Sequence, residues 1–580
     1  MVERQLAIYV PISAVFPGVE PNIETLRSLL QGISRTDALV WCARLNLAVC
    51  DQAKAPIERQ KLGVERFLSP EEIRRVCAYA QSEESGGKPI LVFSRGQLLE
   101  LMRLVATYCE DLPGDGETFN DPEVRRKFCQ AALICSRILD VAIWGKGPVD
   151  NTALALLQGN APDLARKAAE ATSTVDLNIC LGRGWALFRD YLPKHYPSFD
   201  EEFRSSTGLS IEQYFACLAM VLADSVRPAQ EAGFSYSTVL QRNPYNDAFQ
   251  RYMSLESQTP VDLQARSCVS LPESLASLEE IPPYSRRPLL DRPILRTENG
   301  LAVILDPFFF GESAQASPLF HVRRPKKAKD QKPFEAFGHA FEDYINGILG
   351  RMFPTSPILA KRLLVGKEEI GLPLDACIND IGNLVLIETK SVWMTEEIML
   401  TDSSEEYKAF LRSKYVEPKG VGQLTRAISV LSDSGQSGVH GKYKDASVVY
   451  PVMIVRDQFI AAPYFGRFMQ SEFQACLNPD EILPSRRMKK GRLIVAPLTV
   501  IGVDILEGLE SSVRHQGFID ILDSYTRECS DGAISLGNFI ACSPKYEQYF
   551  NPRLSVAAKV LEAFKATARE VFPEADLSQL

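Results

Sequence analysis

An acidic residue, a spacer and a lysine, Glu388-Thr389-Lys390, end a strand-like run of apolar residues. Side chains in a strand alternate between its two faces, so Glu388 and Lys390 would share a face with Leu386, opposite Val385 and Ile387. A carboxylate and an ammonium group side by side are able to bind a metal ion and to position a water molecule. This tripeptide is the first candidate for chemistry in the chain.

The same spacing occurs twice more, so the surrounding residues must separate the three matches. Glu406-Tyr407-Lys408 lies in a charged, helix-like stretch, and proline interrupts Glu417-Pro418-Lys419. Neither match has an aspartate that a neighbouring strand would place opposite it. Only residues 388–390 combine a strand-like setting with such a partner.

That partner is Asp375, near the start of the preceding strand-like run. A four-residue hairpin loop over 380–383 would pair Asn379 with Leu384 and place Asp375 opposite Glu388, with their Cβ atoms about 5 Å apart. Two carboxylates this close repel unless a cation lies between them, so a hard divalent ion such as Mg²⁺ or Mn²⁺ is expected. The alternative is a hairpin with a surface salt bridge from Glu388 to Lys390, which leaves the second acid unexplained.

Two helices are expected beside this hairpin. The first has an apolar stripe that ends before Pro354, formed by Phe334, Phe337, Phe341, Ile345, Ile348 and Met352. Glu342 lies at the edge of the stripe, where an ordinary solvated carboxylate is the alternative reading. The second helix follows Gly420, and Gln423 and Arg426 lie in its N-terminal half, where they could meet a phosphate.

These elements, in this order, resemble the PD-(D/E)xK nuclease superfamily, whose fold occurs in many restriction enzymes and repair nucleases. The matching positions are Glu342, Asp375, Glu388, Lys390 and Gln423. Pro373 stands two residues before Asp375 instead of next to it, which departs from the motif. The resemblance covers residues 331–431 and extends to about 515. It implies an α/β fold with a restriction-endonuclease-like mixed-sheet core in the C-terminal half.

The resemblance also implies an activity, namely divalent-metal-dependent hydrolysis of phosphodiester bonds, with DNA as the expected nucleic acid. Asp375, Glu388 and a main-chain carbonyl near Thr389 would hold Mg²⁺ or Mn²⁺, with Glu342 binding directly or through water. Lys390 would orient or deprotonate the attacking water, and Gln423 would orient the nucleophile, the lysine or the phosphodiester. A role as a bacterial defence or restriction effector follows only by analogy.

The net charge of −9 means that any nucleic-acid partner must be met by local basic patches. Nucleic acid could be bound by two basic clusters, at 323–332 and 486–492, and by one arginine on a helix. The alternative is that these segments are solvated surface. The predicted nucleic-acid-binding residues are Arg323, Arg324, Lys326, Lys327, Arg426, Arg486, Arg487, Lys489 and Lys490.

The length of 580 residues predicts several domains. We expect a mainly helical region for sensing, partner binding or homo-oligomer formation, a connector rich in proline and serine with a β-hairpin at Asn299-Gly300, the nuclease-like domain, and a helical extension. Their predicted bounds are 1–255, 256–330, 331–515 and 516–580. Helical periodicity is clearest over 69–81, 95–110, 121–142 and 209–224.

Several classes of protein are disfavoured. The thirteen cysteines include no C-x-x-C pair, which argues against zinc ribbons and a disulfide framework and favours a reduced, cytoplasmic protein. No apolar run reaches the roughly 20 residues of a membrane helix, and no phosphate-binding G-x-x-x-x-G-K motif occurs. Two alternatives to an enzyme remain: a non-catalytic nucleic-acid-binding module with a nuclease fold, and a protein scaffold with a vestigial site.

Overall fold

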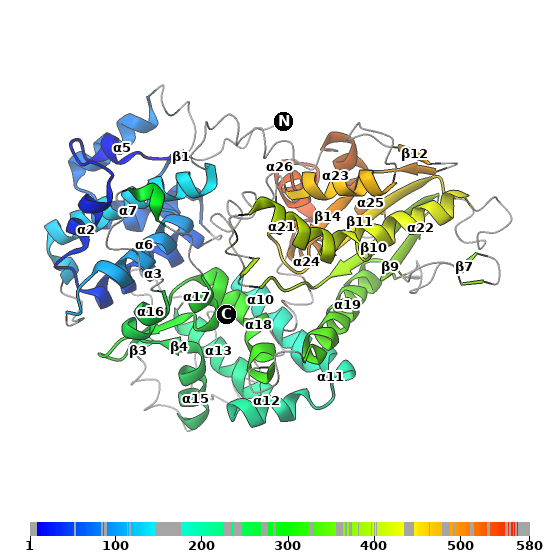
Figure 1. Cartoon of the computed structure of the whole chain (residues 1–580), viewed down its shortest axis with the longest axis horizontal. Helices are drawn as coiled ribbons and strands as arrows, with labels where there is room; N and C mark the ends of the chain where they lie inside the picture. The colour runs from blue at the N-terminus through cyan, green and yellow to red at the C-terminus, as the bar shows by residue number, and fades with distance from the viewer. Residues whose placement is uncertain are drawn as a thin grey trace.

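The computed structural model describes residues 8–144, 176–225, 234–235, 246–267, 277–323, 330–354, 364–433, 446–477, 488–529 and 534–551, with short gaps inside several of these ranges, and a few positions beyond 551. The chain is mostly helical with two small mixed sheets, the larger in its C-terminal half. The predicted α/β class is confirmed at this level. Figure 1 shows the N-terminal helices on one side, the larger sheet on the other, and further helices between them.

The N-terminal helices have their own hydrophobic core, to which Leu39, Leu101 and Phe128 belong. The elements are β1 (Ile8–Tyr9), α1 (Ile12–Val15), α2 (Ile23–Leu30), α3 (Arg35–Cys50), α4 (Pro56–Phe67), α5 (Pro70–Ala80), β2 (Ile90–Leu91), α6 (Arg95–Tyr108) and α7 (Pro122–Trp144). Ser69 and Glu72 form the capping box of α5, because the hydroxyl of Ser69 accepts from the Glu72 amide and the Glu72 carboxylate from the Ser69 amide. The helices predicted over 69–81, 95–110 and 121–142 are confirmed.

The middle of the chain combines helices with a four-stranded sheet of order β3-β6-β5-β4. Its elements are α10 (Leu177–Ala186), the π-helical turn η3 (Leu187–Tyr191), α11 (Leu192–His195), α12 (Phe199–Thr207), α13 (Ile211–Ser225), β3 (Phe234–Ser235), α15 (Asn246–Glu256), β4 (Ser257–Gln258), α16 (Pro260–Ser267), α17 (Arg287–Asp291), β5 (Ile294–Arg296), β6 (Leu301–Ile304) and α18 (Pro307–Arg323). The predicted hairpin is confirmed, since β5 pairs antiparallel with β6, and Gly300 takes φ +81° in its turn. The helix predicted over 209–224 is α13.

Helix α18 was not expected from the sequence. Fourteen of its seventeen residues are buried, so apolar and small residues occur on all of its sides and leave no amphipathic stripe to detect. The segment predicted as part of a connector therefore contains a core helix.

The C-terminal half contains the larger sheet and the helices that cover it. Its elements are α19 (Lys332–Met352), β7 (Leu364–Val365), β8 (Glu368–Glu369), β9 (Ala376–Asp380), β10 (Asn383–Lys390), α21 (Ser404–Leu411), the π-helical turn η5 (Arg412–Val416), α22 (Val421–Asp433), β11 (Val448–Val455), α23 (Phe465–Leu477), β12 (Met488–Lys490), β13 (Leu493–Val495), β14 (Thr499–Gly502), α24 (Val503–Leu509), α25 (Gln516–Glu528) and α26 (Leu536–Cys542). The helical extension predicted over 516–580 contains α25 and α26, and its part beyond residue 551 falls mostly outside the described residues.

The larger sheet has the strand order β12-β13-β11-β10-β9, and β14 also pairs with β11. β10 and β9 are antiparallel, whereas β11 runs parallel to β10, β13 and β14. The predicted pairing of Asn379 with Leu384 is confirmed. The hairpin loop is shorter than the predicted four residues, because Asp380 also pairs with Asn383 and Gly382 turns the chain with φ +81°.

Each face of this sheet has its own helical cover. Val385 and Ile387 of β10 belong to the core formed with α19, α24 and α25, whereas Leu384 and Leu386 belong to the core formed with α21, α22 and α23. Figure 1 shows α19 and α22 on opposite sides of the strands. The two-residue alternation predicted for β10 is therefore confirmed for its apolar side chains.

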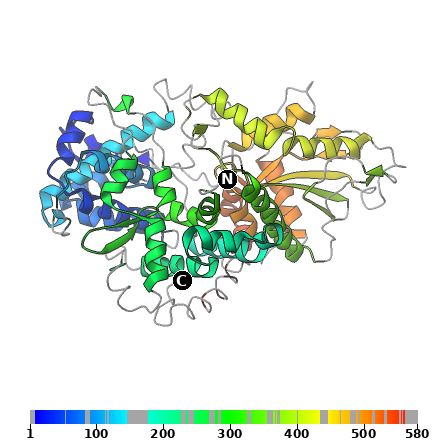
Figure 2. The same ribbon diagram turned by 60° about the horizontal axis from the view of Figure 1, so that its bottom comes forward.

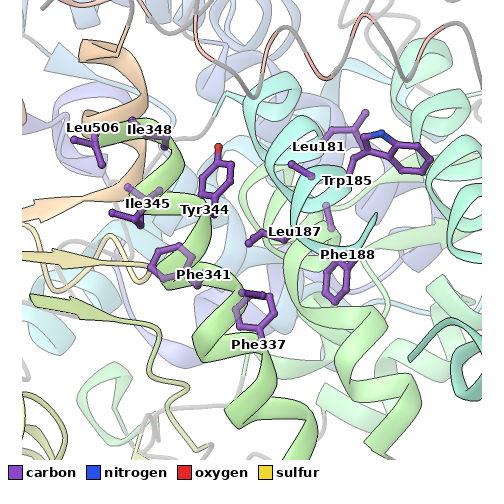
Figure 3. Close-up of a cluster of buried hydrophobic side chains, with 14 of the residues drawn as sticks. Leu181, Trp185, Leu187, Phe188, Phe337, Phe341, Tyr344, Ile345, Ile348 and Leu506 are labelled. Carbon is purple, nitrogen blue, oxygen red and sulfur yellow. The ribbon is translucent and has the colours of Figure 1, made fainter. Parts of the chain in front are cut away.

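Helix α19 also packs against the helices of the middle region. Phe337 lies 5.9 Å from Phe188 between ring centroids, and Tyr344 meets Tyr191 edge to face at 5.6 Å. In Figure 3, the labelled side chains of α19 lie between those of α10 and η3 on one side and Leu506 on the other. One hydrophobic core thus includes residues on both sides of the predicted boundaries at 255 and 330. Figure 2 shows the middle helices between the N-terminal helices and the sheet.

Among the described residues, no single helix is long and apolar enough to cross a membrane. Only α12 and residues 211–223 pass such a test together, as a pair bent by 61°. The described cysteines are free thiols, as expected.

Candidate active site

The predicted acids meet at the carboxyl end of β10. The antiparallel register of β9 and β10 ends with Ala376 opposite Ile387, so the next pair in this register is Asp375 and Glu388. The carboxylate of Asp375 accepts a hydrogen bond of 2.6 Å from the main-chain amide of Thr389. Asp375 is therefore tied to the Glu388-Thr389-Lys390 segment, as the predicted pairing requires.

The surroundings of Asp375 favour its neutral form. Burial and the nearby charge of Glu342 raise the pKa of Asp375 to about 6, against the lowering effect of the Thr389 amide and of Lys390. A cation beside this carboxylate would reverse the shift, because it stabilises the ionised form.

Glu388 is the more deeply buried acid, with a side chain only 2% exposed. Burial, followed by the charge of Asp375, raises the pKa of Glu388 to about 8, although Lys390 opposes the shift. The ammonium of Lys390 donates to Oε1 of Glu388 at 2.5 Å. Oε2 of Glu388 is buried and has no hydrogen-bond partner among the residues that the structure describes. No hydrogen bond from the described residues therefore offsets the cost of burying this oxygen of Glu388.

Glu342 lies at the rim of this group, on α19. Its side chain is 35% exposed and lies 3.3 Å from Nδ1 of His339, which is itself 63% exposed. Glu342 acts on both buried acids, because its charge contributes to the raised pKa of each. A second histidine–carboxylate contact, from Nε2 of His195 to Asp343 at 2.8 Å, lies beside it, and the two histidine rings are 5.6 Å apart.

Gln423 is buried at the start of α22 and approaches the site through Gly420. Its amide oxygen accepts from the Gly420 amide at 3.0 Å. Gly420 takes φ +72°, and a Cβ there would lie 2.1 Å from the carbonyl oxygen of Tyr415 and 3.3 Å from Cε of Lys390. Only glycine fits this turn, and it lets the start of α22 approach the Lys390 side chain.

The donor set fits a hard divalent cation through two residues. Asp375 and Glu388 offer carboxylate oxygens, and the buried Oε2 of Glu388 has no hydrogen-bond partner in the described part of the chain. The pKa of each acid is raised above its usual value, and a bound cation would lower it again. No set of three histidine, cysteine, aspartate or glutamate side chains is arranged to hold a metal ion within the described part of the chain. Glu342 would therefore contribute through a water molecule.

Comparison with protein-family models, with curated proteins and with solved structures gave no significant match to this chain. The assignment of these residues to catalysis and metal binding stays a prediction that rests on the motif and on the geometry above.

The predicted nucleic-acid-binding residues are only partly described. Arg426 pairs with Glu417 at 3.3 Å and donates to the Pro418 carbonyl, and Lys490 donates to the carbonyl of Leu477 at 3.0 Å. These contacts hold local loops and the end of α23, so nucleic-acid binding by Arg426 and Lys490 stays a prediction.

The remaining basic positions give less information. The guanidinium of Arg323 lies 5.0 Å from the ring centre of Phe334. Lys489 belongs to β12. The positions outside the described residues are Arg324, Lys326, Lys327, Arg486 and Arg487.

Sequence reasoning missed three residues beside the site. The main-chain amide of Arg456 donates to the carbonyl of Lys390 at 2.9 Å, and its guanidinium lies 3.7 Å from the ring centre of Trp393. The same guanidinium pairs with Glu312 of α18 at 3.0 Å. Trp393, only three residues after Lys390, could have been noticed from its position, whereas nothing local in the sequence marks Arg456 or Glu312.

Proposed function

We propose that this protein is a divalent-metal-dependent nuclease that hydrolyses phosphodiester bonds of nucleic acid, with DNA as the first substrate to test. The observation that carries the proposal is the group of Asp375, Glu388 and Lys390 at one edge of a mixed sheet, where burial keeps the pKa of both acids high. The sheet, with α19 and α22 on its two sides, is compatible with the restriction-endonuclease-like core that the sequence resemblance implies. A cytoplasmic location rests on the thirteen cysteines without a C-x-x-C pair, and a role in bacterial defence rests on analogy alone.

The roles proposed for the residues come from the resemblance and are compatible with their contacts. Asp375 and Glu388 would bind Mg²⁺ or Mn²⁺ through their carboxylates, with the main-chain carbonyl near Thr389 and, through water, Glu342. A divalent ion bound there polarises the phosphate and lowers the pKa of a bound water. Lys390 would donate from its ammonium to the phosphate oxygens and orient the attacking water. Gln423 would position Lys390 by holding the Gly420 turn against its side chain.

The test is cleavage of several substrates under controlled metal supply. Purified protein is incubated with supercoiled plasmid, linear duplex DNA, single-stranded DNA and RNA, each with Mg²⁺, with Mn²⁺ or with EDTA. Cleavage in the presence of the ion, absent in EDTA and absent for Glu388→Ala, would support the proposal. Equal cleavage by wild type and Glu388→Ala would show that the nuclease is a contaminant or uses another site.

A non-catalytic nucleic-acid-binding module is the second candidate. Two observations favour it: the ammonium of Lys390 is already paired with Glu388 at 2.5 Å, and the described residues hold no three-ligand set for a metal. Binding of nucleic acid that is independent of divalent ions, without cleavage of any of the four substrates, would identify this function.

A further inference from the structure

A cluster of aromatic rings lies directly beyond the carboxyl end of β10. The ring of Trp393 lies 5.6 Å from Phe320 of α18, 6.1 Å from Phe334 and 5.7 Å from Phe337, the last two on α19. Phe320 and Phe334 also meet, at 5.6 Å. Three separate segments of the chain thus contribute to this group, which we call the aromatic cluster.

The aromatic cluster is open to solvent on part of its surface. Phe337 is fully buried, whereas Phe320, Phe334 and Trp393 are each partly exposed. Large rings that are half covered by protein keep area for a further planar contact. The cluster therefore differs from the closed core beneath α19.

Planar cations lie over all three of the partly exposed rings, and the guanidinium of Arg456 is 3.7 Å from the ring centre of Trp393. The guanidinium of Arg323 is 5.0 Å from the ring centre of Phe334, and that of Arg287 is 5.2 Å from the ring centre of Phe320. Arg287 also pairs with Asp291 at 3.5 Å. A guanidinium in this position occupies the kind of ring face on which a nucleic-acid base stacks, and it supplies positive charge for the neighbouring phosphate.

The aromatic cluster is within reach of the candidate active site. Ser391, next to Lys390, lies against α19, since its Oγ is 3.4 Å from the place that a Cβ on Gly338 would occupy. Phe334 and Glu342 are eight residues apart on α19, which is about 12 Å along the helix axis. A strand with duplex-like stacking covers this distance with roughly three or four nucleotides at about 3.4 Å each, and a more extended single strand covers it with fewer.

We infer that the aromatic cluster is a stacking platform for unpaired bases and that single-stranded nucleic acid is the substrate class of the site. A duplex keeps its bases stacked inside and offers the rings mainly its sugar-phosphate backbone, whereas a single strand presents the faces of its bases. The inference deepens the proposed nuclease function and rests on it for cleavage, but binding is measurable without a metal ion.

The experiment is fluorescence anisotropy in EDTA, with a labelled oligo(dT) of about 20 nucleotides and a duplex of equal length. Wild type is expected to bind the single strand about 10-fold more tightly than the duplex. Phe334→Leu, which keeps an apolar side chain but removes the ring, is expected to lose about 10-fold in single-strand affinity, and Phe334→Tyr to retain it. Phe550→Leu is the matched control, because Phe550 is a 37% exposed ring outside the cluster.

Folding of each variant is followed by circular dichroism, and Phe320→Leu provides a second position. Equal affinity of wild type and both leucine variants for the single strand would overturn the inference, and so would tighter binding of the duplex. Loss of affinity in Phe334→Tyr as well as in Phe334→Leu would assign the ring to packing instead of stacking. If binding depends on the rings but no substrate is cleaved, the inference of a stacking platform stands and the proposed nuclease function does not.

Discussion

Asp306 and Glu388 are both buried carboxylates, but the protein surrounds them differently. Arg95 binds Asp306 through two hydrogen bonds of 2.8 and 3.0 Å, and Asn46 and the Phe309 amide each donate to it at 2.8 Å. Glu388 receives one hydrogen bond from Lys390, and its other oxygen has no partner in the described part of the chain.

The difference separates a carboxylate that stabilises the fold from one that we propose as a metal ligand. Asp306 caps α18 and links it to α6 and α3, so its charge is neutralised and its oxygens are satisfied. Burying the charge of Glu388 is unfavourable without a second partner, and raised pKa values of this kind concentrate at functional sites. The uncompensated acid is therefore the better candidate for chemistry.

The largest expected effect is on cleavage by Lys390→Ala. We expect a loss on the order of 1000-fold in the rate with Mg²⁺, because the ammonium would act on charge that develops in the transition state. Lys408→Ala is the matched control, since Lys408 belongs to the same E-x-K spacing but pairs with Glu405 on α21. If Lys390→Ala cleaves at the wild-type rate, the resemblance to the PD-(D/E)xK nuclease superfamily concerns the fold alone.

The structural carboxylate is tested by Arg95→Met. We expect the free energy of unfolding, measured in urea, to fall by about 3–5 kcal/mol, because Asp306 would keep a buried charge without its main partner. Arg204→Met removes an exposed pair with Asp200 and should change stability by less than about 1 kcal/mol. Similar losses in the two variants would contradict the distinction.

The carboxylate proposed to bind a metal ion is tested by Glu388→Gln in EDTA. We expect the free energy of unfolding at pH 7 to rise by about 1–3 kcal/mol, because a neutral amide avoids the uptake of a proton that a folded-state pKa of about 8 requires at this pH. Asp306→Asn is the matched control and should lower stability, since it weakens a satisfied ion pair. A destabilised Glu388→Gln variant would show that the Lys390 ion pair is a net contribution to the fold.

The stability of the metal-free protein should fall as the pH rises. Asp375 and Glu388 have folded-state pKa values of about 6 and about 8, above those of the unfolded chain, so the folded state binds more protons in this range. Their contribution is fully present below about pH 4 and is lost as pH rises through 6 and 8.

Melting temperatures of wild type and of Asp375→Asn/Glu388→Gln, measured in EDTA from pH 5 to pH 8.5, check this. The difference between the two proteins should grow with pH and should shrink when Mg²⁺ is added to the wild type. A constant difference across this range would show that neither acid titrates in it.

The smallest expected effect concerns the basic clusters. The substitutions Arg486→Gln and Arg487→Gln should weaken nucleic-acid binding. They should also reduce the slope of log affinity against log salt by about 0.7–0.9 for each lost phosphate contact. The metal dependence of cleavage should stay unchanged. An unaltered salt slope would place these residues on a solvated surface.

The hairpin that carries the acids could be predicted because its signals are local. Apolar alternation gave the faces of β10, and a few turn residues gave the register that pairs Asn379 with Leu384. The loop length was overestimated, since Gly382 allows a turn with positive φ and lets Asp380 pair as well.

Contacts between distant segments could not be predicted. Arg95 and Asp306 are 211 residues apart, and His195 and Asp343 are 148 residues apart. No spacing rule within one element marks such pairs, because only the folded chain brings them together. Helix α18 was missed for another reason, since a helix buried on nearly all sides has no polar face to give it a period.

The double packing of α19 has a practical consequence for producing this protein in pieces. A recombinant fragment of residues 331–515 would leave uncovered the side of α19 that contacts η3, including Phe337 and Tyr344. Exposed apolar patches of this kind promote aggregation. Soluble protein for assays therefore requires a chain that retains residues 177–323. If a shorter fragment is inactive, misfolding of the sheet is the first explanation, and the result says nothing about catalysis.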